Sequence, residues 1–268
     1  MKRISFLFVS AIVLASCGQK NAVTGRGGGL SLVSEQYMQQ EATAEYQKFL
    51  AENKVVTSAA NDAEMVKRIG TRISTAITKY YTDKGQGSIF DGYKWEYNLV
   101  DNKEANAWCM PGGKIVVYTG LLPLTKNENA LAVVMGHEVA HAVAQHGKER
   151  MNSEMVRQGI GTLGSVFLAG KSPETQNIFQ SLYGTGSQVA FALPNSRKQE
   201  SEADKLGLMY CALAGYNPNE AVPFWERMAA ASSGQKPPEF LSTHPSDETR
   251  IKQIKNEYLP EALKYYKK

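Results

Sequence analysis

The sequence predicts an α+β fold that is mainly α-helical, with a small antiparallel sheet and one buried central helix. Residues 129–144 are almost unbroken apolar sequence, which is typical of a helix buried on all sides. Residues 34–52 and 61–81 repeat apolar side chains at helical spacing, so we interpret them as scaffold helices. Residues 94–99 alternate as a half-buried strand does, and residues 106–118 hold two strand-like runs around a Pro-Gly-Gly break.

The chain begins with the layout of a secretory signal peptide. Lys2 and Arg3 precede an apolar run over residues 4–15, which is too short to span a bilayer securely. The run ends in Leu-Ala-Ser before Cys17, an order that resembles the lipobox of bacterial lipoproteins. We therefore expect residues 1–16 to be removed and Cys17 to carry acyl chains that anchor the protein to a membrane. The alternative is an ordinary secretory signal followed by an unmodified cysteine.

The residue after Cys17 is glycine, which in the lipoproteins it resembles favours the outer membrane and a periplasm-facing location. Residues 17–33 are rich in Gly, Asn, Ser and Thr, so we expect the lipidated N-terminus to continue as a flexible tether. Residues 34–268 are enough for one domain with a sizeable core. Within it, residues 159–170 are apolar and glycine-bearing but too short to cross a membrane, so we expect a packed helix there.

The net charge argues against one class of partner, and the cysteine content leaves two alternatives for the thiols. The formal net charge of +4 includes Lys2 and Arg3, so the processed chain is nearly balanced, which argues against nucleic acid as a partner. Apart from Cys17, the cysteines are Cys109 and Cys211. In an oxidising compartment they could form a disulfide, or they could stay as two buried thiols.

The central helix carries His137, Glu138 and His141 in the order His-Glu-x-x-His. Residues four apart lie on one face of a helix, so His137 and His141 can present two imidazoles to one metal ion. Glu138 can deprotonate a water molecule held by that ion. The alternative is a pair of incidentally buried histidines, but their burial is costly unless something such as a metal satisfies them.

The ends of this helix are also predicted from the sequence. Residues 125–128 have the form of a capping box, which places the helix start just before Asn129. Gly147 is a natural stop after His146. Because His146 lies nine residues after His137, a continuous helix turns it to the opposite side, so we expect it not to bind the same metal.

A catalytic zinc ion takes three protein ligands and keeps one position open, so a third ligand is needed. The candidates lie at the start of a later helix, where Glu200 and Asp204 share one face and Glu202 points roughly the opposite way. Small residues continue the Glu200 face and would let it press against the metal helix, but apolar residues continue the Glu202 face. Spacing alone favours Glu200 only modestly, and Glu202 remains an alternative.

The order and spacing of several motifs resemble those of the HtpX-like and CAAX prenyl protease type 1 zinc metallopeptidases, whose fold is zincin-like. The matching motifs are His137-Glu138-x-x-His141, Ser196-Arg197, Glu200-x-x-x-Asp204, His244-Pro245 and Arg250. The resemblance implies that Glu200 is the third ligand of one Zn²⁺ ion per chain and that Asp204 orients a ligand histidine. It also implies that His244 donates to the oxyanion of the tetrahedral intermediate, with Arg250 supporting the site.

The resemblance extends to Asn106, Ala107 and Trp108, which match the segment beside the cleft and are candidates for substrate binding, although Trp108 and Cys109 depart from the commonest residues there. If this hairpin has a free edge beside the metal, an extended peptide could pair with it through main-chain hydrogen bonds; otherwise it is a structural hairpin. The chain lacks the transmembrane helices of the integral-membrane members. It is therefore more similar to the soluble periplasmic, lipoprotein-type branch.

These observations predict a zinc-dependent endopeptidase that cleaves misfolded or unassembled envelope proteins and meets the membrane through its lipid anchor. Glu138 would take a proton from the attacking water and return it to the leaving amine. The alternative is a non-catalytic, zinc-containing chaperone or assembly factor for outer-membrane proteins. The presence of Glu138 favours the enzyme, because a purely structural zinc site has no use for it.

Overall fold

The computed structural model describes residues 20–26, 31–57, 60–157, 173–183, 196–232, 238–244 and 248–267. The predicted signal peptide, Cys17 and the predicted helix at residues 159–170 lie outside the described residues. The strands are β1 (Glu96–Val100), β2 (Ala107–Met110) and β3 (Lys114–Tyr118). The α-helices are α1 (Glu35–Glu52), α2 (Asn61–Asp83), α3 (Leu122–Thr125), α4 (Glu128–Val143), α5 (His146–Arg157), α6 (Pro173–Tyr183), α7 (Arg197–Leu213), α8 (Ala221–Ser232), α9 (Phe240–Thr243), α10 (Glu248–Gln253) and α11 (Leu259–Leu263).

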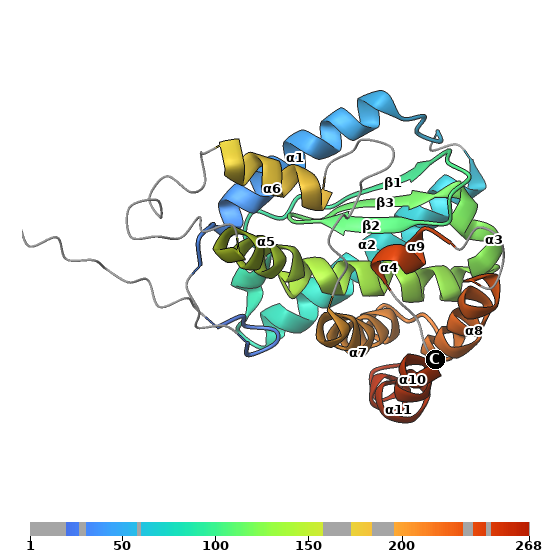
Figure 1. The fold of residues 1–268 in the computed structure, drawn as a ribbon. Helices are drawn as coiled ribbons and strands as arrows, with labels where there is room; N and C mark the ends of the chain where they lie inside the picture. The colour runs from blue at the N-terminus through green and yellow to red at the C-terminus, as the bar shows by residue number, and fades with distance from the viewer. Residues whose placement is uncertain are drawn as a thin grey trace, which may run out of the picture.

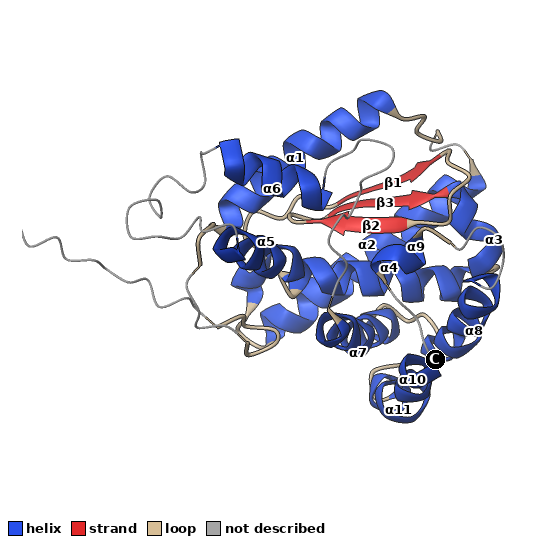
Figure 2. Cartoon of the chain, viewed as in Figure 1, coloured by secondary structure: helices blue, strands red, loops and turns tan. Residues whose placement is uncertain are grey.

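The sheet lies between two groups of helices, as Figure 1 and the secondary-structure colours of Figure 2 show. α1 and α6 cover one face of the sheet, and α2 and α4 cover the other. Side chains of β2 alternate accordingly, with Trp108 in the core on the α1 side and Ala107 and Cys109 in the core on the α4 side. α7 packs against α4, so α4 lies between the sheet and α7.

β3 is the central strand of the sheet, whose order is β1-β3-β2. β2 and β3 form the antiparallel hairpin that the Pro-Gly-Gly break predicts, and Gly112 and Gly113 take a left-handed backbone with φ of 80° and 83°. β1, however, pairs with β3 in the parallel sense, so the sheet is mixed rather than antiparallel throughout. Alternation predicts a strand but not the direction of its neighbour. β2 forms one edge of this sheet.

The starts of the predicted helices follow their capping residues in two cases. Ser34 caps α1 by accepting a hydrogen bond from the backbone NH of Tyr37. Ser196 and Gln199 form a capping box at the start of α7. For α4 the predicted capping box at residues 125–128 is wrong, because α3 takes up Thr125 and the chain then turns. Asn127 is the N-cap of α4 instead.

α4 starts just before Asn129, as predicted, but its end differs from the prediction. The helix ends at Val143, two residues later Gln145 has a left-handed backbone with a φ of 58°, and α5 begins at His146. Gly147 therefore lies inside α5 and does not stop α4. This break could not be predicted from the sequence, because glutamine is uncommon in the left-handed region, whereas glycine is the usual residue there.

The backbones of α4 and α7 come into close contact where two glycines meet. A Cβ atom on Gly136 would lie 2.6 Å from the carbonyl oxygen of Gly207. A Cβ atom on Gly207 would lie 2.7 Å from Cα and N of His137. Real Cβ atoms do not approach backbone atoms this closely, so the crossing requires glycine at both positions. The small-residue face predicted to press α7 against the metal helix is confirmed by this contact.

Part of the predicted flexible tether packs against the domain. The side chain of Asn21 donates a hydrogen bond of 3.0 Å to the carbonyl of Ala144, and Val23 packs against the main core. Leu32 and Val33 are buried in the core beside α1. Composition alone does not reveal these contacts, because a few side chains find partners within a segment that is otherwise rich in small and polar residues.

Cys109 and Cys211 are both buried free thiols, so the alternative without a disulfide is confirmed. Burial raises the pKa of each thiol, and the Glu138 carboxylate raises that of Cys109 further. Among the helices that the structure describes, none is long and apolar enough to cross a membrane.

Replacing Gly207 by alanine should destabilise the fold, although alanine is the better helix former. The new Cβ atom would press on the backbone of His137, which cannot move away without opening the helix crossing. We expect the free energy of unfolding to fall by about 1–3 kcal/mol, measured by urea denaturation. Lys205→Ala on the exposed face of α7 is the control and should change it by less than about 0.5 kcal/mol. An unchanged unfolding midpoint for Gly207→Ala would contradict the tight crossing.

Candidate metal centre

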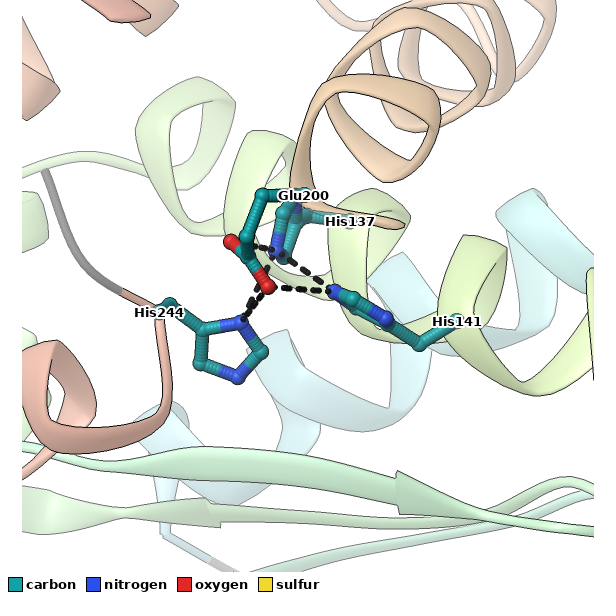
Figure 3. Close-up of side chains that lie close together, drawn as sticks. All are labelled: His137, His141, Glu200 and His244. Carbon is teal, nitrogen blue, oxygen red and sulfur yellow. Dashed lines mark hydrogen bonds and ion pairs between the residues drawn. The ribbon is translucent and has the colours of Figure 1, made fainter. Parts of the chain in front are cut away.

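Four side chains from three parts of the chain meet beside the crossing of α4 and α7. They are His137 and His141 from α4, Glu200 from the first turn of α7, and His244, which follows α9. All four are buried, and each offers one ligand atom within 4.8 Å of the others (Figure 3). The structure thus brings together the histidines and the carboxylate that the sequence predicts as metal ligands, and it adds His244 to them.

The distances within this cluster are short. Nε2 of His137 lies 3.0 Å from Nε2 of His141. The two oxygens of Glu200 lie 3.4 Å from Nε2 of His137 and 3.3 Å from Nε2 of His141. Nδ1 of His244 lies 3.2 Å from Nε2 of His137 and 3.0 Å from Oε1 of Glu200. The four donor atoms therefore face one common point, as Figure 3 shows.

Asp204 and Arg250 support the cluster from behind His137. Oδ1 of Asp204 lies 3.0 Å from Nδ1 of His137, and the Arg250 guanidinium donates two hydrogen bonds of 2.8 Å to the Asp204 carboxylate. Arg250 also lies 3.0 Å from Glu200 and stacks over Trp225, 3.7 Å from the ring centroid. Asp204 is in position to orient His137, as the resemblance implies.

His146 supports His141 in a comparable way, and the sequence did not predict this. Its Nδ1 lies 2.8 Å from Nδ1 of His141, and its Nε2 lies 2.8 Å from Oε2 of Glu202. The prediction that His146 points away from the site is wrong, because it assumed a continuous helix and α4 ends before this residue. His146 is outside the cluster of four donors, as predicted. Glu202, the alternative third ligand, contacts His146 rather than the cluster.

The arrangement of His137 and His141 favours a cation between them. Nδ1 of His137 faces Asp204 and Nδ1 of His141 faces His146, and if both rings are neutral and donate from Nδ1, their Nε2 atoms direct lone pairs toward each other at 3.0 Å. Such lone pairs repel unless a proton or a metal ion lies between them. Burial lowers the pKa of His137, but hydrogen bonds and charge from Asp204 and Glu200 raise it overall to about 9. The same carboxylates favour a divalent cation, and the donor set fits zinc.

The carboxyl groups of Glu200 and Asp204 are held in the ionised form, which favours a bound cation. Burial works to raise the pKa of Glu200, but His244, Arg250 and the ligand histidines hold it well below the usual value. Burial works to raise the pKa of Asp204 as well, but the charge of Arg250 and hydrogen bonds from His137 and Arg250 lower it overall. Burial lowers the pKa of His141 well below its ordinary value, so this ring is a neutral ligand.

Of the other predicted site residues, Glu138 lies beside the donors, whereas the side chains of Asn106 and Trp108 make other contacts. Trp108 is 3% exposed and packs edge-on against Phe49 with ring centroids 5.0 Å apart, so its side chain does not reach the metal centre. Asn106 is buried before β2, where its side-chain oxygen accepts a hydrogen bond from the backbone NH of Ala107. Glu138 is buried beside the donors, with Oε1 3.3 Å from Nε2 of His244.

A family model described as peptidase family M48 matches residues 67–258, which include all four donors and the residues that support them. The chain belongs to this family. The metallopeptidase family assignment made from the motifs is confirmed at this level. The narrower assignment to an HtpX-like, lipoprotein-type branch stays a prediction.

Named relatives in the family come from mitochondria and from bacteria. The chain is 42% identical over 170 residues to the mitochondrial metalloendopeptidase OMA1 of Schizosaccharomyces pombe, covering 63% of this chain and 48% of that protein. It is 33% identical over 175 residues to human metalloendopeptidase OMA1, covering 63% and 33%. It is 31% identical over 169 residues to the beta-barrel assembly-enhancing protease of Escherichia coli K12, covering 60% and 34%. The matched part is less than half of each relative.

Zinc binding to the metal-free protein should release about one proton at pH 7. His137, with a pKa of about 9, holds a proton that the metal ion must displace, whereas His141 is already neutral. Zinc affinity should therefore rise with pH up to about 9 and level off above it. Isothermal titration calorimetry in buffers of different ionisation enthalpy measures this release, and its absence at pH 7 would contradict the assignment.

The raised pKa of His137 also predicts how the stability of the metal-free protein depends on pH, and this dependence is a second check of the pKa. Because folding raises the pKa of His137 from 6.5 to about 9, the stabilisation is complete below pH 6.5 and is lost as the pH rises through about 9. The metal-free protein should thus become less stable over this range, and saturating zinc should reduce that dependence by replacing the proton.

Proposed function

We propose that the protein is a zinc-dependent endopeptidase. The observation that carries the proposal is the meeting of His137 and His141 on α4 with Glu200 on α7, with Glu138 beside them, in a member of a peptidase family. Two imidazoles and one carboxylate form a usual ligand set of catalytic zinc. The relatives named metalloendopeptidases support the same reaction.

Glu138 is the general base of the proposed reaction. Burial raises the pKa of its carboxyl group, which brings its proton affinity closer to that needed at neutral pH. Glu138 would accept a proton from the attacking water and pass it to the nitrogen of the leaving amine. Glu200 and the two ligand histidines would hold the zinc ion, which when bound supplies Lewis-acid activation of the water and of the peptide carbonyl.

His244 is the donor that would have to make room for a substrate. Together with His137, His141 and Glu200 it completes a set of four protein donors, whereas a catalytic zinc keeps one position open. In the proposed enzyme, the His244 ring therefore leaves this position when a polypeptide binds. After this displacement, the His244 ring would donate to the oxyanion, which is the role that the resemblance implies. Arg250 donates a hydrogen bond of 3.2 Å to the backbone carbonyl of His244.

The proposed substrates are misfolded or unassembled envelope proteins. β2 is an edge strand that packs against α4, so an extended polypeptide can pair with its main chain near the metal centre. Because the side chain of Trp108 faces α1, contact at this residue would be made by its backbone. Recognition through the main chain suits substrates that share only an extended, unfolded conformation. The name of the beta-barrel assembly-enhancing protease is consistent with such substrates.

The proposed location is the periplasm-facing surface of a bacterial outer membrane, through lipid on Cys17. The support for this proposal is the basic and apolar start of the chain and the order Leu-Ala-Ser-Cys-Gly that follows it. Since Asn21 contacts the domain only four residues later, a lipid on Cys17 would hold the domain within about 15 Å of its attachment point.

Replacing Glu138 by glutamine should abolish most of the peptidase activity while leaving the metal centre intact. Glutamine keeps the size of the side chain but cannot accept the proton, so we expect kcat to fall by about 10²- to 10⁴-fold. The measurement is cleavage of an unfolded protein such as casein by the zinc-loaded protein, with the zinc content determined in parallel. Glu226→Gln on the exposed surface of α8 makes the same chemical change away from the site and should be fully active.

Retained zinc together with full activity in Glu138→Gln would falsify the mechanism. A zinc-loaded wild-type protein that leaves casein uncut but prevents its aggregation would instead support the non-catalytic chaperone.

Replacing Cys17 by serine should prevent lipid attachment and release the protein from the membrane fraction. The serine hydroxyl does not take the place of the thiol in the lipid transfer that a lipobox directs, so labelled fatty acid should enter the wild-type chain only. Cys109→Ser, at a buried thiol, is the matched control and should still be labelled. Equal labelling of Cys17→Ser and wild type would reject the anchor.

A further inference from the structure

A buried histidine outside the donor cluster connects the metal centre to the N-terminal segment, residues 20–26. His146 is fully buried and bridges His141 and Glu202 through its two ring nitrogens, each at 2.8 Å. Glu202 in turn forms an ion pair with Arg26. A continuous chain of polar contacts therefore runs from a ligand histidine on α4 to a side chain more than a hundred residues earlier in the sequence.

One arrangement of protons on neutral rings satisfies all of these contacts. The Glu202 carboxylate can only accept, so the proton of a neutral His146 ring lies on Nε2 and is donated to Glu202. Nδ1 of His146 then accepts from Nδ1 of His141, which leaves Nε2 of a neutral His141 ring as an acceptor directed at the donor cluster. The Arg26 guanidinium forms an ion pair with the same carboxylate oxygen. Each contact fixes the orientation of the next group.

The N-terminal segment is held in place by contacts other than the ion pair between Arg26 and Glu202. The Asn21 side chain donates to the carbonyl of Ala144, directly after α4, and accepts two hydrogen bonds from backbone NH groups of its own turn. Val23 packs against the main hydrophobic core. Arg26 also pairs with Glu149 on α5. The segment therefore presents the Arg26 guanidinium at a defined place beside the junction of α4 and α5.

We propose that Arg26, Glu202 and His146 are positioning residues of the metal centre, and that the N-terminal segment thereby forms part of its support. They hold the His141 ring with Nε2 directed at the metal position. This inference rests on the proposed metal site. His137 is held separately, by Asp204, so the two ligand histidines depend on different parts of the chain. Loss of the Arg26 contact should weaken metal binding although no donor atom is removed.

The first test measures the zinc affinity of the full chain by competition with a chromophoric chelator. Arg26→Gln and His146→Ala should each weaken zinc binding about 10- to 100-fold, the usual effect of removing the support of a ligand histidine. Arg26→Lys keeps the positive charge and should recover most of the affinity. Lys20→Gln removes a positive charge from an exposed position in the same segment and should leave the affinity unchanged.

The second test separates positioning from a general loss of structure. In the cobalt-substituted protein, Arg26→Gln should change the visible absorption spectrum, which reports the geometry of the ligands, while its far-ultraviolet circular dichroism matches the wild type. Arg26→Gln that binds zinc as tightly as the wild type and gives the same cobalt spectrum would overturn the inference alone. A wild-type chain that binds no zinc would overturn the proposed metal site and this inference together.

Discussion

The close crossing of α4 and α7 is the contact on which the metal centre depends. Because Gly136 and Gly207 leave no side chain between the helices, α7 comes near enough for Glu200 and Asp204 to reach both sides of the His137 ring. An added methyl group at either glycine would press on the backbone of the other helix, and metal–ligand distances tolerate shifts of only about 0.2 Å. The packing that stabilises the domain and the geometry of the donors are thus set by the same contact.

Burial of this much charge is stable only because each group has a compensating partner. An unpaired carboxylate in such a core costs several kcal/mol, as an order of magnitude. Arg250 forms ion pairs with both Asp204 and Glu200, and its guanidinium lies over the Trp225 ring. The pKa values of both carboxyl groups are accordingly lowered, so they stay ionised and attract a cation. The positive charge of Arg250 therefore keeps the two carboxylates ionised, and their negative charge favours a cation at the metal position.

The sequence predicts the parts of this site that follow from helical periodicity. The pair His137 and His141 and the small-residue face of α7 are of this kind, and both are found as expected. The choice between Glu200 and Glu202 could not be made from spacing, because both faces of α7 meet buried groups: one faces the donors and the other faces His146. The parallel pairing of β1 with β3 could not be predicted either, since the alternation of side chains carries no information about the direction of the neighbouring strand.

The break after α4 explains why the contact of His146 with His141 was not predicted and why the N-terminal segment packs beside the end of this helix. In a continuous helix His146 would lie on the side opposite His137. Since the chain turns at Gln145, the His146 ring comes back against His141. The same break leaves the carbonyl of Ala144 without a helical partner, and this is the group that the Asn21 side chain binds. One local change in the backbone therefore creates both the support of a metal ligand and the docking place of the segment that completes it.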